Sequence, residues 1–304
     1  MHNTSKRKIC TYLFCFIFLL NILFTQTLQS QTTPTVFPTD SLAENSPEDG
    51  SLGHKLVYDL KSVAGGVGHM FTGPLRWEKE EFIKAGAFVG ASGLLLLADE
   101  GASNYFSSQG RGIPEGWHRL GWYMGKPQYN YTFTAGVYLT GLVTKNEKIR
   151  RTGVLIIAAA TAGGLVQTVT KTLAGRARPA ADKGNLYFSP FNNEAKYHSF
   201  PSGHTILSTT VVYAISKQFT NPWVKAGILS VGVITPASRL WDNAHWLSDV
   251  AIGAGIAVLS VESVDRFLKK KEKYAADRIT DPHQKKISWN LKLGYNQIGI
   301  VGVF

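Results

Sequence analysis

The chain has little cysteine, which removes several kinds of chemistry. Its 304 residues include only Cys10 and Cys15, and both lie in an apolar run near the amino terminus. If that run is cleaved as a signal, the mature chain has no disulfide, no thiol nucleophile and no thiolate metal ligand. Phe14 stands before Cys15, where an acylated cysteine needs a small residue. We therefore expect neither a thiol-based site nor a lipoprotein anchor.

Acidic residues are also scarce. The chain has 21 Asp and Glu against 32 Lys and Arg, which gives a formal net charge of +11. A basic surface favours anionic partners such as lipid headgroups, nucleic acid or phosphorylated metabolites. Because there is no zinc-finger spacing and no basic stripe interleaved with aromatics, nucleic acid is not expected as a partner. No carboxylate cluster suggests a metal site, so no metal is expected either.

Apolar runs long enough to span a bilayer are rare in this sequence. A span needs about 20 apolar residues. Most charge-free runs are shorter: 85–98, 226–238 and 250–261. Only 152–170 approaches spanning length, although basic clusters at 145–151 and 266–273 lie at helix ends, as in many membrane proteins. We expect an exported helical domain that contacts a membrane surface, with a six-span integral membrane protein as the alternative.

The amino terminus has the pattern of an export signal. The basic triplet 6–8 precedes an apolar core at 9–24, and polar residues follow up to a plausible cleavage site near Ser30. We expect a signal peptide at 1–30 and a flexible linker at 31–53, rich in Thr, Pro, Ser, Asp and Gly. An uncleaved anchor is the alternative. The protein is therefore expected in the cell envelope, either periplasmic or membrane-associated.

Apolar residues at helical spacing predict an all-α fold for residues 54–278. The expected helices are 54–70, 82–98, 131–144, 152–172, 203–217, 224–238 and 245–266. Residues 99–130, rich in glycine and aromatics, are expected to be irregular. In the tail, 279–304, alternation from Ile287 and a turn-like stretch at Gly294 predict a small β-hairpin that packs on the helical bundle.

Three short polar stretches interrupt the helical pattern, and each falls at a helix boundary. They cover residues 171–179, 200–204 and 238–249. One expected helix ends at the first stretch, the next begins at the second, and a later one ends at the third. If these helices alternate in direction, the three stretches lie at one end of a bundle. We therefore expect these distant segments to form one site.

Residues of these stretches suit the binding of a phosphoryl group. Lys171 offers a point charge, while Arg178 and Arg239 can each give forked, charge-assisted hydrogen bonds. Ser202 and Gly203 open a helix, whose backbone N–H groups form a ready anion site. The set fits a charge that is spread over three oxygens in the transition state.

Two histidines and one carboxylate complete a plausible reaction centre. Asp249 lies four residues after His245, so a shared helix face would let its carboxylate accept the Nδ1 proton and leave Nε2 free to attack phosphorus. His204 would protonate the leaving group and then activate water. The rate should then require a neutral His245 and a charged His204 in the free enzyme. Each residue alone also fits a structural role, and the combination carries the hypothesis.

The complete pattern resembles the type 2 phosphatidic acid phosphatase and vanadium haloperoxidase superfamily. It is Lys-x6-Arg-Pro, Pro-Ser-Gly-His and Ser-Arg-x5-His-x3-Asp, within a motif core at 130–266. The resemblance implies a helical bundle and hydrolysis through a phosphohistidine, without metal or other cofactor. It also implies the roles given above for Lys171, Arg178, Ser202, Gly203, His204, Arg239 and His245.

The expected substrate is a phosphomonoester or diphosphate of a lipid, such as phosphatidic acid or an isoprenoid or glycerolipid phosphate, and a small soluble phosphoester is the alternative. Two alternatives stay open. A haloperoxidase would use the same anion site and would need vanadate as cofactor. A non-catalytic envelope protein would keep the bundle as a scaffold, although every motif position is present.

Overall fold

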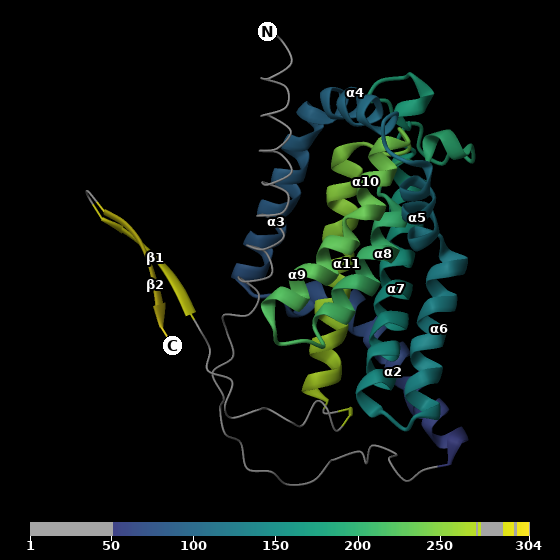
Figure 1. The fold of residues 1–304 in the computed structure, drawn as a ribbon, viewed down its shortest axis with the longest axis vertical. Helices are drawn as coiled ribbons and strands as arrows, with labels where there is room; N and C mark the ends of the chain where they lie inside the picture. The colour runs from purple at the N-terminus through teal and green to yellow at the C-terminus, as the bar shows by residue number, and fades with distance from the viewer. Residues whose placement is uncertain (1–50, 272, 275–287, 295–296, 304) are drawn as a thin grey trace.

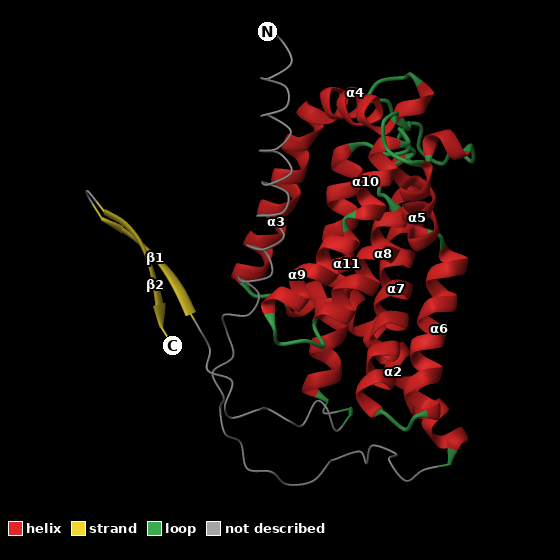
Figure 2. Cartoon of the chain, viewed as in Figure 1, coloured by secondary structure: helices red, strands yellow, loops and turns green. Residues whose placement is uncertain are grey.

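The computed structural model describes residues 51–271, 273–274, 288–294 and 297–303. The predicted signal peptide at 1–30 and nearly all of the predicted linker lie outside the described residues, so both stay predictions. The described part is dominated by helices (Figure 2). The predicted all-α class of the main domain is therefore confirmed.

The helices follow one another through short connections. In chain order they are α2 (Leu52–Phe71), α3 (Lys79–Leu94), α4 (Asp99–Gly110), α5 (Glu115–Gly125), α6 (Pro127–Val143), α7 (Glu147–Ala174), α8 (Gly203–Ser216), α9 (Pro222–Gly232), α10 (Ile234–Trp241) and α11 (Leu247–Lys270). Short 3-10 turns lie between them: η1 (Gly73–Arg76), η2 (Leu95–Ala98), η3 (Pro179–Ala181) and η4 (Ala195–Tyr197). The longest connection, between α7 and α8, holds the first polar stretch and leads into the second.

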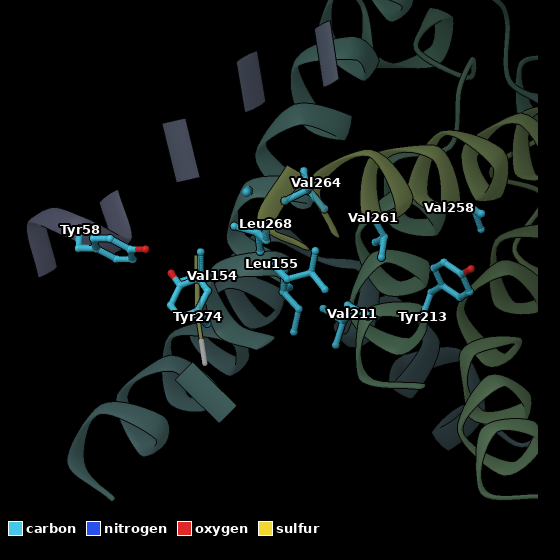
Figure 3. Close-up of a cluster of buried hydrophobic side chains, with 14 residues drawn as sticks. Tyr58, Val154, Leu155, Val211, Tyr213, Val258, Val261, Val264, Leu268 and Tyr274 are labelled. Atoms are coloured by element: carbon cyan, nitrogen blue, oxygen red, sulfur yellow. The ribbon is translucent and has the colours of Figure 1, made fainter. Parts of the chain in front are cut away.

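Helix α7 lies at the centre of the bundle and contacts α2, α6, α8 and α11 (Figure 1). Its side chains Val154 and Leu155 are fully buried and pack in one cluster with Val261 and Val264 of α11 (Figure 3). Burial of each such side chain contributes about 1.5–3 kcal/mol. The core therefore fixes α7 and α11, which carry residues of two polar stretches.

The bundle end opposite the polar stretches contains buried ion pairs. Arg151 of α7 donates to Asp265 of α11 at 2.8 Å, and both side chains are buried. Arg150 lies 3.6 Å from Asp59 of α2, whose carboxylate also accepts from Tyr138 at 2.7 Å. Two of the basic residues at 145–151 are therefore paired inside the bundle, and they do not form a surface cluster.

Three helical runs of the described part are long and apolar enough to cross a membrane, judged by length and composition. They are Lys79–Gly110, Glu147–Ala174 and Leu247–Lys270. The prediction that only 152–170 approaches spanning length was therefore wrong. Some charged residues that bound the apolar runs in the sequence lie inside longer helical runs, where they have partners in the bundle. Asp99 pairs with Arg176, and Glu262 pairs with Lys217.

Two further sequence predictions were wrong. Residues 99–130 form α4, α5 and the start of α6, because glycines there serve close helix packing and do not break the helices. A Cβ at Gly121 would lie 2.2 Å from the Ser238 hydroxyl of α10. The expected helix 224–238 divides into α9 and α10 near Gly232, where a Cβ would lie 2.8 Å from Val212.

The described part of the tail contains two strands. Strand β1 (Ser288–Gly294) pairs antiparallel with β2 (Gln297–Val303), and Ser288 lies opposite Val303. Residues 279–287, 295–296 and 304 lie outside the described residues. A hairpin that occupies the tail and packs on the helical bundle therefore stays a prediction.

Candidate active site

The three polar stretches meet at one end of the bundle, where α4 and α10 lie (Figure 1). The backbone N–H of Ser202 donates to the carbonyl oxygen of Asp249 at 3.1 Å. The indole N–H of Trp246 donates to the carbonyl oxygen of Ala177 at 2.7 Å. These two bonds join the first and second stretches to the third, so the three segments form one unit.

Helix α7 ends at a glycine that turns the chain into the first stretch. Gly175 has a φ of +56°, in the left-handed region that favours glycine, and its N–H donates to the carbonyl of Lys171 at 3.0 Å. A Cβ at this position would lie 1.8 Å from the carbonyl oxygen of Ser189. The turn therefore places Lys171 in the last turn of the helix, with Arg178 in the loop beyond it.

The second stretch forms the start of α8. The Ser202 side chain is fully buried, and its oxygen accepts from the Thr205 hydroxyl at 3.0 Å. Gly203 packs so closely on α7 that a Cβ would lie 2.5 Å from the Gln167 side chain. His204 follows in the first helical turn, and its Nε2 has no hydrogen-bond partner among the described residues.

Arg239 is held at the end of α10 by residues outside the predicted set. Its guanidinium donates to Asp242 at 2.6 Å. The other carboxylate oxygen of Asp242 lies 2.6 Å from Nδ1 of His118 in α5. His118 and Asp242 thus orient one of the predicted phosphate-binding arginines.

His245, the predicted nucleophile, is buried in the loop between α10 and α11. Its Nδ1 lies 2.7 Å from the carbonyl oxygen of Ser199. Because a carbonyl can only accept, Nδ1 carries the proton and Nε2 has the lone pair. No hydrogen bond to Nε2 is formed by the described residues, so this nitrogen is available for an attack.

The predicted bond from His245 to Asp249 was wrong. Helix α11 begins at Leu247, so His245 lies before the helix and does not share a helical face with Asp249. The Asp249 carboxylate instead accepts from the backbone N–H of Trp246 at 3.1 Å and from the Ser199 hydroxyl. Asp249 therefore acts on His245 through Ser199, whose carbonyl binds the imidazole.

Sequence reasoning missed a buried charge network beneath the site. Arg176, which is 1% exposed, donates to Asp249 at 2.6 Å and to Asp99 at 2.7 Å. Asp99 also accepts from the Ser248 backbone N–H at 2.9 Å and from the Ser248 hydroxyl at 2.6 Å. One signal was available in the sequence, because Arg176 stands inside Gly-Arg-Ala-Arg-Pro beside the predicted Arg178.

Burial and nearby cations keep both histidines neutral in this structure. Burial, followed by the charges of Arg178 and Lys171, holds the pKa of His245 well below its usual value. Burial and the charges of Arg239, Arg178, Lys171 and Lys126 lower the pKa of His204 to about 3. The expectation that His204 is charged in the free enzyme was therefore wrong, because cations surround it.

The arrangement offers an anion several cationic donors and the Nε2 lone pair of a neutral imidazole, that of His245. Lys171, Arg178 and Arg239 all lie close enough to shift the pKa of His204 downwards. Within the described residues, no three His, Cys, Asp or Glu side chains gather as metal ligands. The expected independence from a metal stays a prediction.

Comparison with known proteins agrees with this site. Residues 152–271 match the family described as the PAP2 superfamily. This match, together with the relatives described below, supports the type 2 phosphatidic acid phosphatase superfamily and a phosphatase activity. The match contains all three polar stretches, so the family and the geometry point to the same residues.

The chain is similar to several lipid A 1-phosphatases. One from Rhizobium etli is 28% identical over 193 residues, which are 59% of this chain and 80% of that protein. One from Rhizobium johnstonii is 32% identical over 92 residues, 30% of this chain and 37% of the relative. One from Porphyromonas gingivalis is 30% identical over 99 residues, 32% of this chain and 19% of the relative. No solved structure matches the chain.

Proposed function

We propose that this phosphatase hydrolyses a phosphomonoester or diphosphate carried by a membrane lipid, through a phosphohistidine formed on His245. The observation that carries this proposal is the hydrogen bond between Nδ1 of His245 and the Ser199 carbonyl. It fixes the tautomer in which Nε2 is the nucleophile. The same nitrogen lies in a region where Lys171 and Arg178 attract a phosphate.

The first step forms the bond from Nε2 of His245 to phosphorus as the bond from phosphorus to the leaving oxygen breaks. Lys171, Arg178 and Arg239 stabilise the charge on the equatorial oxygens, together with the backbone N–H groups at the start of α8. In the second step water attacks phosphorus and gives a proton to His204, which is neutral after the first step, while the P–N bond breaks and inorganic phosphate leaves. The Ser199 carbonyl stabilises the partial positive charge that the imidazole develops during the first step.

The proton for the leaving group has to pass through His204, which is neutral in the free enzyme. A phosphate dianion beside it would oppose the surrounding cations and raise its affinity for a proton. A substrate that binds as a phosphate monoanion itself carries the proton that His204 needs. We therefore expect His204 to become protonated only in the complex with substrate, and then to donate to the departing oxygen.

This proton supply predicts an unusual pH profile. Burial and the surrounding cations lower the pKa of His204 to about 3 and hold that of His245 well below its usual value, so both should be neutral at pH 7 in the free enzyme. The value of kcat/KM should fall as pH rises above ~6, where a phosphate monoester loses its second proton. Substrates with a more acidic phosphate should move this fall to lower pH. A fall fixed near pH 6.5 for every substrate would assign it to a histidine.

A lipid substrate is supported by the surface of the bundle as well as by the relatives. Helix α3 and the turn after it expose large apolar side chains: Val89, Leu94 and Leu97 are 61%, 68% and 87% exposed. The run that contains them is one of the three with spanning length and composition. A membrane-associated bundle meets phosphorylated lipids in the bilayer. The names of the relatives also give a lipid as the substrate. The side of the membrane that the site faces follows from the predicted export signal and stays a proposal.

The function is tested with purified full-length protein in detergent micelles and a panel of substrates. We expect phosphate release from lipid phosphates, unchanged in excess chelator, and little from soluble phosphoesters. Rapid acid-free quenching with radiolabelled substrate should trap label that is stable to base and lost in acid, as a phosphohistidine is. Bromide oxidation that depends on vanadate would replace the proposal with the haloperoxidase. A panel without any turnover would favour the scaffold.

A further inference from the structure

A fourth cation lies beside the site and belongs to none of the three polar stretches. Lys126 stands between α5 and α6, and its Nζ lies 4.0 Å from the centre of the Trp122 ring. The centre of the same ring lies 6.5 Å from that of His204. Lys126 also contributes to the low pKa of His204. Trp122 therefore places an ammonium group next to the predicted general acid.

The turn that carries Lys126 is fixed against His204. Gly125 packs so tightly that a Cβ would lie 2.6 Å from the Cβ and 2.8 Å from the Cα of His204. On the other side, the backbone N–H of Asn130 donates to the Lys126 carbonyl at 3.0 Å, and its side-chain amide donates to Met124. Both ends of the turn are held, so the position of Lys126 relative to His204 is set by packing.

Lys126 has no ion-pair partner in the described part of the chain. Its ammonium instead lies over Trp122 and within 5.8 Å of the Tyr129 ring centre. Contact with an aromatic face stabilises a cation without neutralising it. A half-buried cation that faces an anion site, with its charge not compensated by a carboxylate, is suited to bind a second anionic group.

The position of the second anionic group follows from the roles of the residues around the phosphate that is attacked. Lys171 and Arg178 lie near His245 and so face the phosphorus that is attacked. His204 faces the leaving oxygen, because it is the acid that protonates it. Lys126 contacts the Trp122 ring that lies beside this acid, and it is close enough to lower the pKa of His204, so it lies on the leaving-group side. A leaving group that is itself a phosphate needs a cation there more than it needs a proton.

We propose that Lys126 and Trp122 form a leaving-group subsite that binds the lipid-linked phosphate of a diphosphate substrate. The inference rests on the proposed function. His245 attacks the terminal phosphorus, the bond to the bridging oxygen breaks, and its electron pair stays on the departing lipid monophosphate. Water then releases inorganic phosphate from the histidine. The exposed rings of Tyr123 and Tyr129 lie beside this subsite, as aromatic side chains do at the depth of lipid headgroups.

The test compares an isoprenyl diphosphate with the monophosphate of the same chain in detergent micelles, using wild type, K126Q and K126R. The plateau of kcat/KM across pH is measured, so that a shift of the His204 titration does not distort the result. For the diphosphate, K126Q should lose about 10- to 100-fold, the effect of one charge-assisted hydrogen bond. For the monophosphate the loss should stay under about threefold, and K126R should restore most of the diphosphate rate.

The matched control is K183Q, which removes an exposed lysine from the α7–α8 connection at the same end of the bundle. It should leave both substrates unaffected. Equal losses on both substrates in K126Q, or none on either, would overturn the subsite while leaving the phosphatase intact. Failure of the wild-type protein to hydrolyse either lipid would overturn the proposed function, and the subsite with it. A preference for binding a non-hydrolysable methylene diphosphonate, lost in K126Q, supports the subsite without turnover.

Discussion

Replacing His245 with alanine should lower kcat by about four orders of magnitude or more, as loss of a covalent nucleophile does in other hydrolases. The variant keeps the cations that bind phosphate but has no nitrogen to attack it. Binding of vanadate or inorganic phosphate should therefore survive the substitution. Phosphate release and phosphohistidine trapping measure the loss, and both should disappear together.

The H245N variant separates catalysis from folding. An asparagine amide N–H lies where Nδ1 does and can donate to the Ser199 carbonyl, but it offers no nucleophile. H54A is the matched control, because His54 is exposed at the start of α2 and far from the site in the chain. Activity in H245N within tenfold of wild type would show that another group attacks phosphorus.

The second large effect is expected from R176M, which removes the cation between two buried carboxylates. Asp99 and Asp249 are both fully buried, and each pairs with Arg176. Loss of one partner of a buried ion pair costs about 3–5 kcal/mol, because the remaining charge has no compensation. We expect the free energy of unfolding in denaturant to fall by an amount of this order.

Two variants decide whether the lower free energy of unfolding of R176M comes from the uncompensated charges. D99N combined with R176M leaves only one carboxylate without its cation and should recover part of the stability. R119A is the surface control, since its pair with Glu115 at 2.8 Å is exposed to solvent, and it should leave unfolding unchanged. If R176M unfolds at the same denaturant concentration as R119A, the network has no stabilising role.

R176M should also affect catalysis in the protein that stays folded. Arg176 holds Asp249, and Asp249 accepts from Ser199, which binds the nucleophile. Loss of this series of contacts should lower kcat more than it raises KM. The imidazole loses its orientation, whereas the predicted phosphate-binding cations stay in place.

The sequence predicted that the three polar stretches meet, because chemistry and helix direction restrict each of them. Lys171 ends one helix, Ser202 begins the next and Arg239 ends another, so alternation of helix direction brings them to one end. The positive φ at Gly175 and the start of α8 at Gly203 follow from local residue types. Local rules therefore predicted which residues meet.

The same rules could not predict the partners of these residues. The pair between Arg176 and Asp99 joins residues 77 positions apart, and only the packing of α4 on α10 and α11 brings them together. Asp249 was assigned to His245 because four residues separate them, but α11 starts between the two. A helix boundary that moves by two residues thus changes the partner of the predicted nucleophile.

Helix α7 relates the site to the depth of a bilayer. Arg151 pairs with Asp265 near one end of α7, and Lys171 lies in the last turn at the other. These residues are 20 positions apart, which corresponds to about 30 Å along a helix, close to the thickness of the hydrocarbon layer. Where α7 crosses a membrane, the predicted phosphate-binding cations lie level with the headgroups. A lipid can then present its phosphate to His245 while its chains remain in the bilayer. The dephosphorylated lipid is therefore still in the bilayer after the reaction and needs no carrier protein.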